Sequence, residues 1–200
     1  RDALNYHMRP HAVVVLRAVP AAEAWHARFS AIGRAYRYRI LDRPARPALL
    51  AGRVWHIDHR MDVPAMRAAA AALLGRHDFT SFRAAACQAK SPVRTLDRLD
   101  VTRDGDLVEI VAEARSFLHH QVRNMAGTLK LVGQGRWPAA RVAEALAARD
   151  RAAAGPTAPA DGLSLTGVRY PADPFATLDR KSYSPLFLWI GAGYLILVVM

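Results

Sequence analysis

The chain has 200 residues, 52% of them hydrophobic, which is enough for about one domain with a sizeable core. Lys and Arg number 28 against 17 Asp and Glu, so the net charge is +11 and the pI is about 10.8. An enzyme for small neutral metabolites has no need of this excess. It favours a polyanionic partner, either nucleic acid or an anionic membrane surface, unless the surface is merely basic because the genome is arginine-rich.

Two residue types narrow these classes. Arginine supplies nearly all of the positive charge. Because a guanidinium group binds phosphate through paired N–H donors and stacks on bases, this composition favours a nucleic-acid partner. The single cysteine, Cys87, excludes an internal disulfide and a thiolate metal cluster, which fits a reducing cytoplasm.

The first forty residues predict a helix end and two strands. Residues 2–6 read as the tail of a helix cut in the middle, with no apolar signal segment, so we expect the chain to be incomplete at this end. Residues 13–19, VVVLRAV, form an apolar run typical of a buried strand. Residues 34–41 alternate, with Tyr36 and Tyr38 on one face and arginines on the other, which predicts a second strand.

A proline-bearing loop, residues 42–55, separates these strands from a predicted helix. Asp62 is its expected cap, Pro64 lies in its first turn and Gly75 stands just past its end. Residues 77–95 are read as an irregular basic stretch.

The middle of the chain predicts a hairpin and a core helix. Two extended runs, 95–101 and 107–114, flank Asp104-Gly105, a strong hairpin signal. Residues 116–133 are predicted to be helical, because apolar residues recur at steps of four and three: Leu118, Val122, Met125, Leu129 and Val132.

The last elements complete an α+β pattern. Pro138 begins a predicted helix that runs to about Arg149, residues 151–162 form a flexible connector, and residues 163–170 form a last strand. Because strands and helices are interspersed around a hairpin, the chain is predicted to be α+β, with a mostly antiparallel sheet flanked by helices.

The composition changes after residue 175. We therefore predict one domain over residues 1–175 and an unrelated apolar tail over 176–200. Residues 185–200 carry no charge, and about 15 of them are apolar, fewer than the roughly 20 that span a bilayer. The tail is either an interrupted membrane helix, giving membrane contact through 186–200, or an extension without a role.

Polar residues beside the apolar stripe suggest a site. His119, His120 and Arg123 occupy the first turns of the predicted helix. A shared metal is disfavoured because adjacent side chains diverge by about 100° on a helix, and Ser116 with His119 is a weak nucleophile signal without an oxyanion motif. Each of these residues taken alone is more often a packed or surface residue than a site residue.

Four segments in the same order resemble one family, the TruA-type tRNA pseudouridine synthases. They are GRAYRYRI, HDFTSFRAAACQAKSPVRT, RSFLHHQVRNMAGTLKLVGQGRW and PTAPADGLSLTGVRYPADPF. The resemblance implies the pseudouridine synthase fold and isomerisation of uridine to pseudouridine in the tRNA anticodon arm, at tRNA positions 38 to 40. It also implies a reaction without cofactor or metal and a homodimer that binds tRNA across both subunits.

The resemblance also assigns roles to residues of this chain. Tyr36 matches the active-site tyrosine, which stacks on the target uracil and is expected to help remove the C5 proton. Arg123 matches the arginine that pairs with the catalytic aspartate. Leu163 lies in the block that lines the base pocket. Further RNA-facing positions are Lys90, Arg94, His119 and His120. Gly127, one turn beyond Arg123, is expected to allow close approach of a neighbouring backbone.

One departure from the family pattern limits these expectations. The family's catalytic aspartate lies in a GRTDAGVHA-like block, and no aspartate of these 200 residues has that context. We expect the chain to be a fragment that is inactive by itself. The alternatives are a catalytically dead tRNA-binding remnant and a protein tethered to a membrane by its tail.

Overall fold

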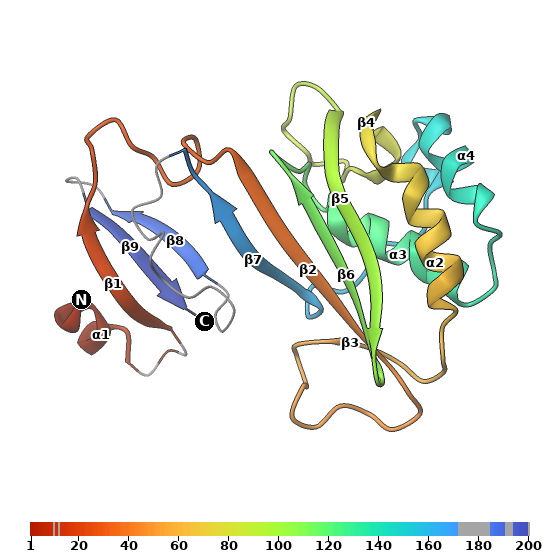
Figure 1. The fold of residues 1–200 in the computed structure, drawn as a ribbon, viewed down its shortest axis with the longest axis horizontal. Coiled ribbons are helices and arrows are strands. Elements are labelled where there is room, and N and C mark those ends of the chain that lie inside the picture. Colours follow the sequence, from red (N-terminus) through yellow and green to blue (C-terminus); the bar gives the residue numbers. More distant parts are fainter. Residues whose placement is uncertain (10, 12, 172–184, 191–193, 200) are drawn as a thin grey trace. The chain divides into compact units, whose positions relative to one another are not determined.

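The computed structural model describes residues 1–9, 11, 13–171, 185–190 and 194–199 (Figure 1). The chain forms two compact units, residues 36–164 and residues 1–35 with 165–200. In chain order the elements are α1 (Asp2–His7), β1 (Val14–Pro20), β2 (Gly33–Asp42), β3 (Trp55–Ile57), α2 (Val63–Ala70), a 3-10 turn (Ala71–Leu73), β4 (Gly75–Asp78), a 3-10 turn (Thr80–Phe82), β5 (Val93–Asp104), β6 (Leu107–Ala114), α3 (Gln121–Gly133), α4 (Ala140–Ala148), a 3-10 turn (Arg151–Ala153), β7 (Leu163–Arg169), β8 (Pro185–Ile190) and β9 (Tyr194–Val199).

The larger unit is built on a mixed, mostly antiparallel sheet with the strand order β3-β2-β6-β5-β4, and β7 also pairs with β2. The pairs β4–β5 and β5–β6 are antiparallel, whereas β2 and β3 run parallel. Gly105 adopts φ 56° in the tight turn between β5 and β6, which confirms the predicted hairpin. The α+β class with a mostly antiparallel sheet is likewise confirmed.

Helices α2, α3 and α4 gather on one side of β5 and β6 (Figure 1). The sheet meets them with an apolar face, because alternate residues of β6 from Val108 to Ala114 are buried. The stripe of α3 is buried as predicted, Met125 and Leu129 completely. Burying each such side chain contributes about 1.5–3 kcal/mol, so the stripe fixes α3 in the core.

The predicted cap of α2 is confirmed. Asp62 Oδ1 accepts a hydrogen bond from the Ala65 N–H at 2.9 Å, and the helix ends at Ala70 before a 3-10 turn. Residues 77–95, in contrast, are more ordered than predicted. β4 runs to Asp78 and β5 begins at Val93, because the two segments pair with each other, with His77 opposite Arg94.

The predicted start of the helix at residue 116 is wrong. α3 begins at Gln121, because His120 adopts a left-handed backbone conformation, φ 62°, which a right-handed helix cannot contain. Gln121 then caps the turn before it, where its Oε1 accepts the Leu118 N–H at 2.9 Å. His119 and His120 therefore precede the helix, and only Arg123 lies on it.

Residues 151–162 were predicted to be a flexible connector, but hydrogen bonds hold this segment in place. It begins as a 3-10 turn, and Arg151 donates to the carbonyl of Gly155 at 2.8 Å. Gly155 donates its N–H to the Thr128 hydroxyl on α3 at 2.9 Å. We call residues 155–160 the strap.

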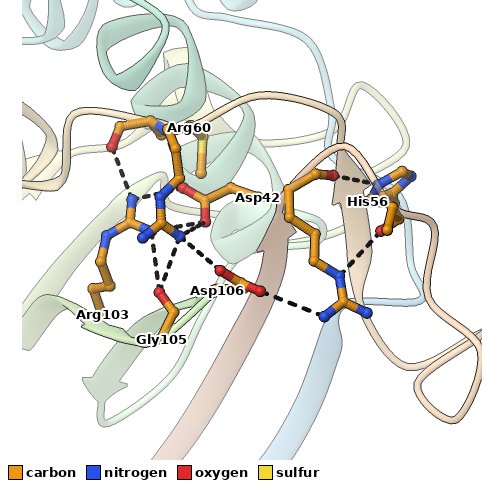
Figure 2. A network of polar contacts seen from close by, with 9 residues as sticks. Asp42, His56, Arg60, Arg103, Gly105 and Asp106 are labelled. Carbon is orange, nitrogen blue, oxygen red and sulfur yellow. Dashed lines mark hydrogen bonds and ion pairs between the residues drawn. The ribbon is translucent and has the colours of Figure 1, made fainter.

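A buried carboxylate links β2 to the hairpin (Figure 2). Asp42 ends β2 with no exposed surface, and Arg103 of β5 donates to both of its oxygens at 2.7 and 2.6 Å. The Met61 N–H donates to Oδ2 at 3.0 Å. Arg60 lies between Asp42 and the half-exposed Asp106, at 3.4 and 3.0 Å.

The smaller unit contains a three-stranded antiparallel sheet of order β1-β9-β8. A strand forms at Val14–Pro20 as predicted, but it is only partly buried, because Val15 is 3% exposed and Val14 is 50% exposed. The predicted boundary at residue 175 lies outside the described residues. Residues 185–190 and 194–199 form strands where a membrane helix was one expectation, and no helix of the described residues is long and apolar enough to cross a bilayer.

Candidate active site

Arg123 projects from the first turn of α3 into a set of hydrogen bonds with the strap. Its Nε donates to the Ala158 carbonyl at 2.7 Å, and its own carbonyl accepts the Ala158 N–H at 3.1 Å. Its Nη1 lies 3.1 Å from His120 Nε2. These contacts hold the half-buried guanidinium in one orientation. Among the described residues, no carboxylate forms an ion pair with Arg123.

His120, the partner of this arginine, has an unusual backbone conformation. A left-handed conformation is uncommon for a residue with a side chain, and such strain clusters at functional sites. Burial, with the nearby His119 and the charge of Arg123, lowers the pKa of His120 below its ordinary value. A neutral imidazole can accept a hydrogen bond, and Arg123 can only donate, so His120 Nε2 is the acceptor at neutral pH.

The aromatic side of the site comes from β2. Tyr36 is half-buried at the margin of the main core, edge-on to Phe117 with 5.2 Å between ring centroids. Tyr38, two residues along the same strand face, is fully buried, and its hydroxyl donates to the Pro159 carbonyl at 2.8 Å. Burial raises the pKa of Tyr38 well above its usual range, while the positive charge of Arg123 opposes this shift.

The strap connects the two sides. Arg123 and Tyr38 bind the neighbouring carbonyls of Ala158 and Pro159. Leu163, just after the strap, packs half-buried on the same core as Tyr36. The sequence did not predict these contacts with the strap. It assigned a site role to Tyr36, but none to Tyr38, Phe117 or Pro159.

The strap approaches α3 closely at a glycine. A Cβ added to Gly127 would lie 1.8 Å from the Pro156 carbonyl oxygen, so only glycine fits. This confirms the expected backbone approach at Gly127. The buried Asn124 fixes Thr157, the strap residue after Pro156, because its Oδ1 accepts a hydrogen bond from the Thr157 hydroxyl at 2.6 Å. Glycine and prolines within 155–160 were the available signal that this segment is constrained.

The other predicted residues lie at varying distances from this arrangement. His119 is exposed, with its ring 3.9 Å from that of His120, and its N–H points to Cys87 Sγ at 3.5 Å. Lys90 is exposed, and the described residues show no contact between it and Arg123. Arg94 lies on β5 and lines a different hollow, with Arg76 and Arg115. The described residues contain no group of three His, Cys, Asp or Glu side chains suited to a metal ion.

Comparisons with known proteins match most of the chain. A family profile described as tRNA pseudouridine synthase matches residues 69–171. A tRNA pseudouridine synthase A from Acidiphilium cryptum is 72% identical over 176 residues, which are 88% of this chain and 69% of the relative. Relatives of the same name from Gluconobacter oxydans (60% over 175 residues, 88% of this chain and 64% of the relative) and Rhodospirillum centenum (64% over 168 residues, 84% and 69%) also match. The chain thus spans about two thirds of these relatives' length.

Proposed function

Since the chain belongs to the tRNA pseudouridine synthase family, we propose that it binds tRNA and takes part in converting uridine to pseudouridine in the anticodon arm, at tRNA positions 38 to 40. The observation that carries this proposal is the meeting of Arg123 and the β2 tyrosine face at the strap. It brings an oriented cation and an aromatic strand face to the same side of the sheet. The net charge of +11 suits a phosphate-rich substrate.

Tyr36 is the proposed stacking platform for the target base. Enzymes that act on a base must take it out of the stack, and an extruded base is held by an aromatic face in a dry pocket. The edge-on contact with Phe117 fixes the Tyr36 ring from one side. Leu163 is proposed to line the same pocket, because it packs on the core beside Tyr36.

Arg123 is proposed to orient the carboxylate that attacks the nucleotide. An opposite charge within about 4–6 Å favours the ionised form of a carboxylate. Isomerisation exchanges the N1–C1′ bond of uridine for a C5–C1′ bond and moves a proton from C5 to N1, without net oxidation or reduction. Tyr36 is proposed to assist removal of the C5 proton. The aspartate itself must come from outside these 200 residues, since no aspartate here lies in the family's block.

A fusion tests this assignment. The aspartate-bearing segment of the Acidiphilium cryptum relative is joined in frame before Arg1, and tritium release from tRNA labelled at uridine C5 is measured. We expect the 200 residues alone to bind tRNA without release and the fusion to release tritium. Arg123→Lys in the fusion should lower release by about 100-fold, because a misplaced catalytic group costs on that order.

The exposed Arg136, just beyond α3, provides the matched control. Arg136→Lys should leave release unchanged. Turnover by the 200 residues alone would contradict the need for an outside aspartate. Tight tRNA binding by a fusion that never turns over would instead support a catalytically inactive tRNA-binding protein.

Three further expectations belong to this proposal. A homodimer is proposed from the family resemblance, and sedimentation of the full chain tests it. A cytoplasmic location is proposed because tRNA is the substrate. Membrane contact through residues 186–200 stays a prediction, which flotation of the full chain with anionic vesicles, compared with a chain ending at residue 175, would check.

A further inference from the structure

A basic hollow opens in the larger unit, away from the contacts of Arg123 with the strap. It has a volume of about 330 Å³, and its lining includes Arg76, Ser91, Arg94, Thr95, Arg115 and Ser116. Three arginines and three hydroxyl-bearing residues thus line one space, and no carboxylate is among the described residues that line it. The donors suit an anion with several oxygen acceptors.

The sheet register brings these residues together from three strands. Arg76 of β4 lies opposite Thr95 of β5. On the other side of β5, Leu96 lies opposite Ala114, the last residue of β6, so Arg115 follows at the level of Thr95. Arg76, Thr95 and Arg115 are exposed, whereas Leu96 and Ala114 are buried toward the core. The row therefore lies on a sheet surface that the core does not use.

Arg94 is held in place before any ligand arrives. Its Nη1 donates to the carbonyls of Ser91 at 3.0 Å and Val93 at 2.6 Å. Its Nε is buried and has no hydrogen-bond partner in the structure. Neither Arg94 nor Arg76 forms an ion pair with a described residue. The charges of Arg94 and Arg76 are therefore not balanced by a carboxylate of the described residues, which favours an anionic ligand.

We propose that this hollow is a phosphate-binding subsite, which holds a phosphodiester of the tRNA backbone outside the base pocket. This inference rests on the proposed function, since tRNA is taken as the ligand. Arginine binds phosphate through paired N–H donors, and contacts of this kind position a nucleic acid without reading its sequence. The subsite would fix the register of the anticodon arm against the base pocket.

The salt dependence of tRNA binding tests the subsite. Each phosphate contact contributes about 0.7–0.9 to the slope of log K against log salt concentration. We expect Arg76→Gln and Arg94→Gln each to lower the slope by about that amount. The affinity ratio of the parent chain to the variant should then narrow about 3-fold between 50 and 200 mM salt. Arg46→Gln removes the same charge from an exposed loop and should leave the slope unchanged.

The outcomes separate this inference from the proposed function. Failure of the parent chain to bind tRNA would overturn both proposals. If the parent chain binds tRNA but Arg76→Gln and Arg94→Gln have the same salt slope as Arg46→Gln, the subsite alone is overturned. Titration with inorganic phosphate, followed by arginine Nε–H NMR signals, provides a second arm. Saturable binding that disappears in Arg94→Gln, together with an unchanged tRNA salt slope, would assign the hollow to a free anion and refute the backbone contact.

Discussion

The buried carboxylate of Asp42 offers a sharp test of how the larger unit is held together. Asn is nearly the same size as Asp but removes the negative charge. In Asp42→Asn, the two bonds from Arg103 at 2.7 and 2.6 Å can no longer both be accepted. Arg103 is three-quarters buried, so its guanidinium would keep its charge in a site with little water (Figure 2).

The expected cost follows from that uncompensated charge. Breaking a buried ion pair by removing one partner costs about 3–5 kcal/mol, against a total stability of about 5–15 kcal/mol for a domain. Asp106, about half exposed, pairs with Arg60 and Arg43. An exposed pair contributes about 0–1 kcal/mol, so Asp106→Asn is the matched control. Asp42→Asn combined with Arg103→Met should recover most of the loss, because no buried charge then remains.

Urea unfolding followed by circular dichroism at 222 nm measures these differences. The signal reports mainly on the larger unit, which contains α2, α3 and α4. With a slope of about 1–3 kcal/mol per molar urea, a 3 kcal/mol loss lowers the midpoint by at least about 1 M. Equal midpoints for Asp42→Asn and Asp106→Asn would refute the reasoning. So would a double variant that is no more stable than Asp42→Asn.

Three further outcomes are expected. Burial alone would raise the pKa of Asp42, but hydrogen bonds and arginine charges outweigh it and lower the pKa. The contribution of Asp42 to the free energy of unfolding is therefore present above the unfolded pKa and is lost as the pH falls below about 4. Asp42→Asn should flatten the stability-versus-pH curve in that range. Gly127→Ala should cost at least about 2 kcal/mol in urea unfolding, because its Cβ would lie 1.8 Å from the Pro156 carbonyl oxygen. Gly133→Ala on the same helix should cost less, because its Cβ meets mainly the side chain of Met66, which can shift more easily than a backbone carbonyl. Asn124→Ala should cost about 1–3 kcal/mol by leaving buried partners unpaired, and faster proteolysis of the strap should accompany it; unchanged protection would count against its role.

Local patterns in the sequence determined several elements correctly. Asp62 capped its helix, Asp104-Gly105 made its hairpin, and the apolar steps of α3 were buried. Each depends on residues a few positions apart, so the sequence carries the whole signal. The family resemblance also rests on contiguous segments of sequence, and the site roles that it assigns to Arg123 and Tyr36 stay predictions.

Only the tertiary structure decided how these parts meet. The apolar period continued back to Leu118, yet His120 took a left-handed conformation and α3 began later. The strap read as a flexible connector, although Arg123 and Tyr38 bind its carbonyls from elements far away in the chain. The arginine hollow depends on the register of three strands. In each case the deciding energy comes from hydrogen bonds and packing between residues distant in sequence, which no local pattern of side chains records.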